Sequence, residues 1–100
     1  MYGTVARIRV KAGKEEALRQ LSQEEQGLKI PGWLFENAYR MDADPQEYFL
    51  VVGFESREAY VANADSPEQD ERYLRFRELL ESDPEWHDGE IAYSYWTTRA

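Results

Sequence analysis

The chain has 100 residues, which is enough for one domain with a hydrophobic core but not for two. With 42% hydrophobic and 14% aromatic residues, its composition is that of a folded globular protein. The chain has 12 basic and 20 acidic side chains. The resulting net charge of -8 argues against nucleic acid or an anionic lipid surface as a partner. The chain contains no cysteine, which excludes disulfides and thiolate metal sites.

The sequence also gives no sign of a membrane segment. No apolar run is long enough to span a bilayer, and the opening stretch MYGTVARIRVK is too charged for the core of a signal peptide. We therefore expect a cytoplasmic protein without a membrane partner.

The first two expected elements are a strand and an amphipathic helix. In residues 2–10, alternation of apolar residues with two arginines predicts a strand with one apolar face. After Gly13, apolar residues recur at helical spacing until about Gly27. The helical positions are Ala17, Leu18, Leu21 and Leu28.

Two further strands are expected in the middle of the chain. Pro31-Gly32 predicts a turn before a strand over residues 33–41, and the polar loop 42–46 leads into a strand over residues 47–54. Strands joined by so short a loop are antiparallel. Residues 49–52 are apolar without alternation, which predicts a central strand covered on both faces.

A second helical region and a last strand complete the prediction. Ser56 is a suitable N-cap for a short helix over residues 57–64, and Ser66 with Pro67 is expected to begin a longer one. Residues 82–89 are expected to form a loop before a strand over residues 90–98. The apolar face of the longer helix would comprise Tyr73, Phe76 and Leu80.

The order β-α-β-β-α-β predicts a single α+β domain over residues 1–100, with the ferredoxin-like arrangement of an antiparallel four-stranded sheet and both helices on one face. The other face would stay bare, although Tyr93, Tyr95 and Trp96 give the last strand aromatic residues at both parities. A large apolar sheet face usually marks an interface. We therefore expect a homodimer.

No specific catalytic motif is present. His87 is the only histidine, and with Glu85, Asp88 and Glu90 it forms a poor metal site because consecutive loop residues rarely converge on one ion. As a general base its pKa would suit neutral pH, but a histidine in a turn is more often exposed or hydrogen-bonded to neighbours.

Asn63 and Tyr73 are the most plausible ligand-binding pair. Both would lie near the space between helices and sheet, where an amide and a phenol can orient a polar aromatic and stabilise its anion. From the residues alone, the plainer interpretation is preferred: Asn63 ends a helix and Tyr73 is part of the core.

The sequence resembles the antibiotic biosynthesis monooxygenase family along nearly its whole length. The resemblance rests on VARIRVKAGKEEALRQL, on PGW before the second strand, and on FESREAY followed by SP after the third. These are markers of the fold rather than of catalysis. The resemblance implies a dimeric α+β barrel with a ligand cavity between sheet and helices in each subunit.

Family members include cofactor-independent monooxygenases of anthrone- or quinol-type aromatics and haem-degrading relatives. The resemblance disfavours haem degradation, because Ala6 stands where that branch has an asparagine and the helices contain neither Trp nor His. For the aromatic-oxidising branch, Asn63 and Tyr73 match two of the expected residues. The helical Trp is missing, and either Arg75 or Arg77 would supply the arginine.

The resulting prediction is a monooxygenase without cofactor or metal that acts on a small polar aromatic. Asn63 and Tyr73 would be catalytic, and Trp33, Arg75 and Trp96 would bind the substrate. The alternatives are a non-catalytic ligand-binding or stress-associated dimer and a barrel that serves only for oligomerisation, since fold does not fix function.

Overall fold

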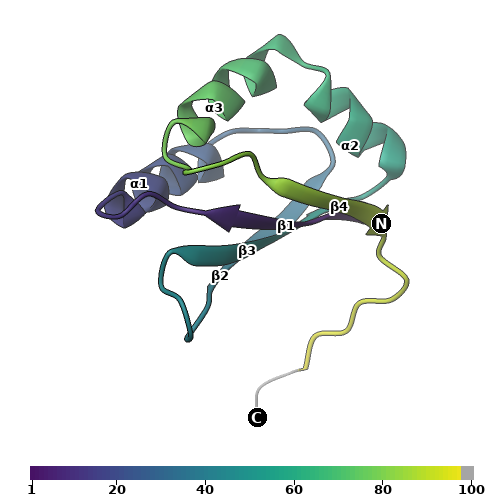
Figure 1. Cartoon of the computed structure of the whole chain (residues 1–100). Helices are drawn as coiled ribbons and strands as arrows, with labels where there is room; N and C mark the ends of the chain where they lie inside the picture. Colours follow the sequence, from purple (N-terminus) through teal and green to yellow (C-terminus); the bar gives the residue numbers. More distant parts are fainter. Residues whose placement is uncertain (98–100) are drawn as a thin grey trace.

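The computed structural model describes residues 1–97, and its elements follow the predicted order (Figure 1). The second helical region is divided in two, as the Ser66-Pro67 break predicted. The elements are β1 (Tyr2–Arg9), α1 (Glu15–Gln26), β2 (Trp33–Arg40), β3 (Glu47–Phe54), α2 (Arg57–Ala64), α3 (Pro67–Arg77) and β4 (Glu85–Glu90).

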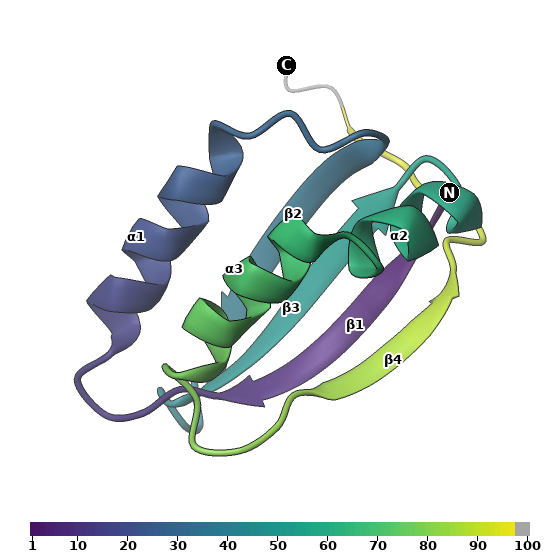
Figure 2. The same ribbon diagram turned by 90° about the horizontal axis from the view of Figure 1, so that it is seen from above.

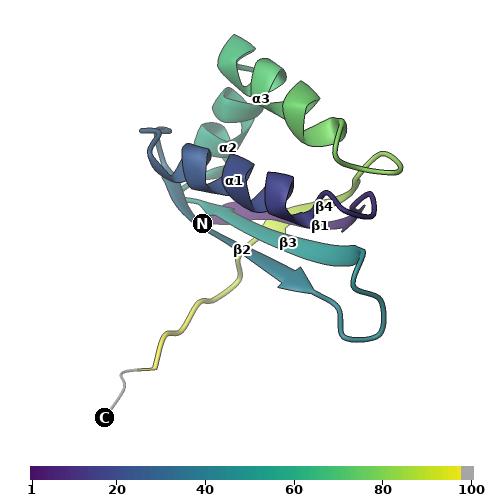
Figure 3. The ribbon, with the colours of Figure 1, turned by 90° about the vertical axis from the view of Figure 1, so that its left-hand side faces the viewer.

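The four strands form one antiparallel sheet in the order β2-β3-β1-β4. All three helices lie on the same face of this sheet (Figure 3). Seen from the helical side, α1 lies toward the β2 edge, while α2 and α3 lie over the middle of the sheet (Figure 2). The predicted α+β, ferredoxin-like fold is therefore confirmed.

Local signals in the sequence account for the helix starts. The Ser56 hydroxyl accepts a hydrogen bond from the Ala59 backbone N–H at 3.1 Å, and the Ser66 hydroxyl accepts one from Gln69 at the same distance. Each bond satisfies a backbone donor that the first turn leaves without a helical partner. The two N-caps that the sequence predicted are thus confirmed.

The alternation of β1 separates the two faces of the sheet. Ala6 and Ile8 point toward the helices and are buried, as is Val10 just beyond the strand end, whereas Val5 and Arg7 point away and are exposed. Tyr48 and Leu50 of β3 extend the same core. The core lies at the end of the sheet where β1 ends and α3 leads into β4, because Val10 is bridged there to the buried Leu80.

The last strand lies five residues earlier than predicted. The fourth strand was predicted over residues 90–98, but β4 is Glu85–Glu90 and residues 91–97 have no regular structure; position 98 lies outside the described residues. The cause is the length of β1. Glu90 pairs with Tyr2, the first residue of β1, and the Ile91 N–H donates to the Met1 carbonyl at 2.9 Å, so β4 ends where its pairing with β1 ends.

The aromatic residues predicted for the last strand therefore lie in an extended tail. This tail runs away from the sheet on the side opposite the helices (Figures 1 and 3). Tyr93, Tyr95 and Trp96 are 86%, 78% and 74% exposed. The prediction that they cover both faces of strand four was wrong.

Apolar residues of β1, β2 and β3 nevertheless line the face without helices, which we call the open face. The Phe35 ring occupies the space over Gly53, because a β-carbon at Gly53 would lie 2.2 Å from it. The neighbouring apolar side chains are Val5, Tyr39, Phe49 and Val51, of which Tyr39 is 55% and Val5 43% exposed. The outward-pointing residues of these three strands thus form an apolar surface opposite the helices.

Candidate active site

A cavity of about 420 Å³ lies between the helices and the sheet; we call it the central cavity. Its floor is the inner face of the sheet, and its walls come from α1, α2 and α3. The volume falls within the range of small-molecule sites, and most of the lining is apolar. The polar and aromatic side chains that line it include Thr4, Trp33, Glu36, Tyr60, Asn63, Tyr73, Trp86 and Asp88.

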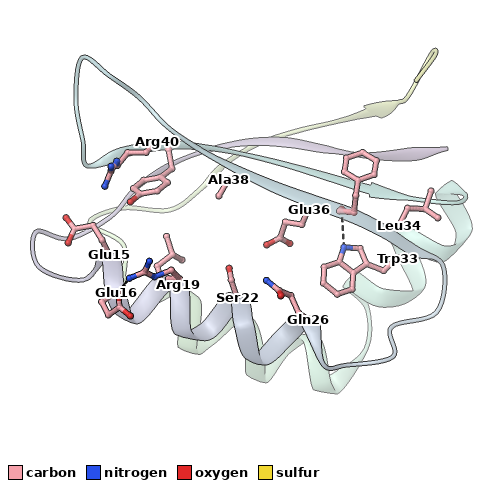
Figure 4. Close-up of a pocket in the computed structure, with 13 residues that line it drawn as sticks. Glu15, Glu16, Arg19, Ser22, Gln26, Trp33, Leu34, Glu36, Ala38 and Arg40 are labelled. Carbon is pink, nitrogen blue, oxygen red and sulfur yellow. Dashed lines mark hydrogen bonds and ion pairs between the residues drawn. The ribbon is translucent and has the colours of Figure 1, made fainter. Parts of the chain in front are cut away.

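A second hollow of about 630 Å³, the edge groove, lies between α1 and β2 (Figure 4). Charged side chains such as Glu15, Arg19 and Arg40 line its outer part. It shares Trp33 and Glu36 with the central cavity, so the two hollows adjoin at these residues. An aromatic ring and a carboxyl group therefore belong to the linings of both hollows.

Asn63 and Tyr73 both line the central cavity. The Asn63 side-chain oxygen accepts a hydrogen bond from Arg72 at 3.4 Å, and the same guanidinium is held by Gln69 at 3.0 Å. Within residues 1–97 the Asn63 side-chain nitrogen makes no hydrogen bond, so it can donate to a ligand. The Tyr73 ring packs at 6.3 Å from Phe76 and 6.4 Å from Trp86, measured between ring centroids.

Trp33 contributes an apolar wall to both hollows. Its indole N–H donates to the Phe35 carbonyl at 3.2 Å, as the dashed line in Figure 4 shows. This bond uses the only donor of the side chain. Trp33 can therefore contact a ligand through its ring but not through a hydrogen bond.

Arg75 and Trp96 do not line the central cavity. The Arg75 guanidinium lies 2.5 Å from the Glu24 carboxylate, and this ion pair links α3 to α1. Trp96 is in the tail on the other side of the sheet. Arg77, the other candidate arginine, is bound to Asp83 at 2.8 Å and to the Leu80 carbonyl at 3.0 Å.

Tyr60 and Asp88 form a polar pair in the cavity that the sequence analysis missed. The Tyr60 hydroxyl donates to Asp88 Oδ1 at 2.8 Å. Burial, followed by the hydrogen bond and charge of Asp88, raises the pKa of Tyr60 to about 12, although the nearby Thr4 hydroxyl acts in the opposite direction. Tyr60 is therefore a neutral phenol at physiological pH.

Thr4 and Glu36 are also unexpected members of the cavity lining. Thr4 is only 5% exposed, and its hydroxyl has no hydrogen-bond partner of normal geometry within residues 1–97. Burial and the charge of Glu25 raise the pKa of Glu36 to about 7. The sequence could have indicated both residues, because alternation along a strand places each of them on the same face as buried apolar residues.

His87 lies outside this site. It was predicted in a loop, and that placement was wrong because β4 includes it, paired with Val5. Its Nε2 is 3.0 Å from Glu85 Oε1, which confirms the expected bond to a neighbouring residue. Within residues 1–97, no three His, Cys, Asp or Glu side chains are grouped so as to hold a metal ion.

The sequence model of one protein family matches residues 1–78, the greater part of the chain. That model describes antibiotic biosynthesis monooxygenases. The chain belongs to this family. Among curated proteins, none is similar enough in sequence to count as a relative.

Solved structures agree with this family at the level of the fold. A protein of the same family name from Chloroflexus aurantiacus is 22% identical, with a TM-score of 0.75 over 95% of this chain and 96% of that one. A second, from Bordetella bronchiseptica, is 21% identical, with a TM-score of 0.78 and coverage of 92% and 97%. A mutant of SnoaB, a cofactor-independent oxygenase from Streptomyces nogalater, is 14% identical, with a TM-score of 0.78 and coverage of 93% and 94%.

A tryptophan that the sequence analysis did not expect there lines the central cavity of this chain. The sequence lacks the helical Trp expected from the resemblance, but Trp86 of β4 lines the cavity and contacts Tyr73. Sequence reasoning missed it because residues 82–89 were assigned to a loop. The cavity thus combines two tryptophans, two tyrosines, an amide side chain and a carboxyl group of raised pKa.

Proposed function

We propose that the chain is a cofactor-independent monooxygenase that oxidises a small polar aromatic of the anthrone or quinol type with O2. The observation that carries this proposal is the central cavity, whose size suits such a ligand and whose walls combine aromatic rings with polar groups. Trp33, Tyr73 and Trp86 would contact the ligand rings. The Asn63 amide would donate to a ligand oxygen.

In this reaction the substrate itself reduces O2. Loss of a proton converts the aromatic to an electron-rich anion, and the protein contributes water exclusion and hydrogen bonds that favour this anion. For an anthrone, the CH2 carbon becomes a carbonyl, one oxygen atom of O2 enters the product, and the other leaves as water with the two hydrogens of that carbon. No further reductant is needed for this balance.

Asn63 and Tyr73 are assigned to orientation of the anion, and Trp33 to substrate binding. Arg75 would act in binding by tying α3 to α1 beside the cavity, because its guanidinium is engaged with Glu24. Trp96 would act from the tail of a neighbouring subunit, since its own subunit places it on the far side of the sheet.

The test is O2 consumption with a panel of anthrones and quinols. Wild-type protein should consume one O2 per anthrone oxidised, and the Asn63→Ala and Tyr73→Phe proteins should be at least tenfold slower while still folded by circular dichroism. Equal rates for these variants and wild type would contradict the catalytic role of Asn63 and Tyr73. A matched control is Tyr39→Phe, which alters a tyrosine on the open face.

The non-catalytic alternative predicts binding of the same aromatics without O2 consumption. The structure favours a ligand site over a barrel that serves only for oligomerisation, because Trp33 and Tyr73 line the cavity rather than fill it. No helix within residues 1–97 is long and apolar enough to cross a membrane. We propose that the protein acts in the cytoplasm.

We propose in addition that two copies associate through their open faces. Phe35, Tyr39, Phe49 and Val51 give this face an apolar surface, which a second copy would cover. The exposed aromatic tail leaves the sheet on the same side and would extend the contact. Light scattering at micromolar concentration should give twice the mass of one chain, and a mass of 11.8 kDa would contradict the proposal.

A further inference from the structure

Three residues in register form a row across the floor of the central cavity. Glu36 of β2 pairs with Val52 of β3, which pairs with Thr4 of β1. All three side chains line the cavity, with the apolar Val52 between the two polar ends. The Cα atoms of Glu36 and Thr4 are therefore roughly 10 Å apart, since neighbouring strands are about 4.8 Å apart.

The Glu36 carboxyl group has no hydrogen bond or ion pair with another side chain of residues 1–97. Figure 4 shows it pointing from β2 into the space in front of α1. A carboxylate held without partners in a half-buried position favours its protonated form. It is therefore suited to accept a proton from a ligand, because a general base works best when its pKa is near the working pH.

Several ionisable groups share the two hollows with Glu36. Glu25 of α1 is the one whose charge raises the pKa of Glu36, and burial is the larger cause. The others in the central cavity are Tyr60, Asp70, Arg72, Tyr73 and Asp88. Those in the edge groove are Glu15, Glu16, Arg19, Arg40 and Tyr48.

At the other end of the row, the Thr4 hydroxyl is buried and without a partner of normal geometry. An unpaired polar group in such a position costs free energy that a ligand oxygen would recover by accepting its hydrogen bond. Tyr60 does not donate to the ligand oxygen, because its hydroxyl proton is donated to Asp88. The Thr4 hydroxyl, which also lies near the Tyr60 oxygen, is thus a donor on the floor that a ligand oxygen can engage.

The geometry points to Glu36 as the group that takes the substrate proton and to Thr4 as the donor to the oxygen at the opposite edge of the same ring. An anthrone offers an acidic C–H and an oxygen at opposite ends of one ring, which is the substrate class already proposed above.

This assignment rests on the proposed function and adds a step to it. The C–H or O–H proton passes to the Glu36 carboxylate, and its electron pair stays on the ring, whose negative charge gathers on the oxygen held by Thr4. After O2 has reacted, Glu36 returns the proton to the water that leaves. The residue is unchanged over the cycle, so the overall balance remains substrate plus O2 giving the ketone plus water.

The test uses 1,8-dihydroxyanthrone, first without O2 and then with it. Under nitrogen, wild-type protein should shift the absorption spectrum of the bound compound to that of its anion at pH 7.5, and Glu36→Gln should bind it in the neutral form. With O2, Glu36→Gln should lower kcat by about 100-fold, in the range typical of a lost general base. Glu36→Asp should recover part of the rate.

Two further variants separate a chemical role from a structural one. Thr4→Val should lower kcat/KM by about tenfold, as expected for one lost hydrogen bond. Glu58→Gln, on the exposed surface of α2, is the control and should match wild type. In wild type kcat/KM should rise with pH to a plateau above about 7, and this limb should be absent in Glu36→Gln.

The outcomes distinguish the two claims. Anion formation under nitrogen without O2 consumption would support Glu36 and overturn the monooxygenase. O2 consumption that is equal in wild type and Glu36→Gln would overturn the role of Glu36 and leave the monooxygenase standing. Binding of the compound by wild type without any anion would overturn the role of Glu36, whereas no binding at all would overturn both claims.

Discussion

The two faces of the sheet differ although they are built from the same strands. Val51 and Val52 are neighbours in β3, yet Val52 lies on the cavity floor under the helices and Val51 lies on the open face. The helix-covered face is apolar with a few polar residues in one row, whereas the open face is apolar over β2 and β3 and charged where Arg7 meets Glu47 at 2.7 Å. Under the proposals made above, the first face holds a small ligand and the second meets another copy of the chain.

The largest expected effect comes from shortening a core side chain on the helix-covered face. Leu50→Ala should lower the free energy of unfolding by about 2–4 kcal/mol, because it removes buried methyl groups and leaves a cavity. Denaturant unfolding should show the same loss at every protein concentration. A loss below about 0.5 kcal/mol would mean that Leu50 is not part of the folding core.

A charge on the open face should act on association instead. Val51→Asp should weaken self-association by at least about 100-fold, because a carboxylate would be buried there without a partner. The matched control is Val61→Asp on α2, where the native side chain is 38% exposed. Sedimentation should give monomers for the first variant and dimers for the second, and a dimeric Val51→Asp would place the interface elsewhere.

Glu36→Gln should stabilise the fold in a pH-dependent way. Since the pKa of Glu36 rises from 4.5 to about 7 on folding, the folded state binds the proton more tightly, and stability is lost as pH rises through this interval. Replacement by glutamine removes this loss, so the variant should match wild type near pH 4 and exceed it by about 2 kcal/mol above pH 8, after allowance for partial exposure. A constant difference across this range would show that Glu36 titrates normally.

The smallest effect is expected at the ion pair between α3 and α1. Arg75→Ala should lower the free energy of unfolding by at most about 1 kcal/mol, because both partners are largely exposed. By comparison, Ser66→Ala removes an N-cap and should cost about 1 kcal/mol at any salt concentration. The Arg75 effect should instead disappear in 1 M salt, and its persistence there would indicate a role beyond charge pairing.

Sequence reasoning predicted the elements that depend on local signals. The serine N-caps, the Pro31-Gly32 turn and the alternation in residues 2–10 each act through neighbouring residues, so their positions are close to those in the structure. The prediction of the last strand was wrong because the limits of this strand depend on its pairing with β1, which is distant in sequence. Strand composition favoured the aromatic stretch after Glu90, but β1 pairs with residues 85–90 instead.

The candidate site was predictable only in part. Asn63, Tyr73 and Trp33 follow from the helix and strand limits together with the resemblance, and all three line the cavity. Thr4 and Glu36 required the pairing register, which places two polar residues distant in sequence in one row. A single sequence gives no register across strands, so their proximity was not visible beforehand.

The comparison between the two faces can be tested by one contact measurement. Nuclear Overhauser effects between bound 1,8-dihydroxyanthrone, kept under nitrogen, and the valine methyl groups distinguish adjacent residues on opposite faces. Contacts to Val52 and to the Tyr73 ring, with none to Val51, would place the ligand in the central cavity as proposed. Contacts to Val51 or Val5 in place of Val52 would contradict the assignment of the helix-covered face as the reaction site.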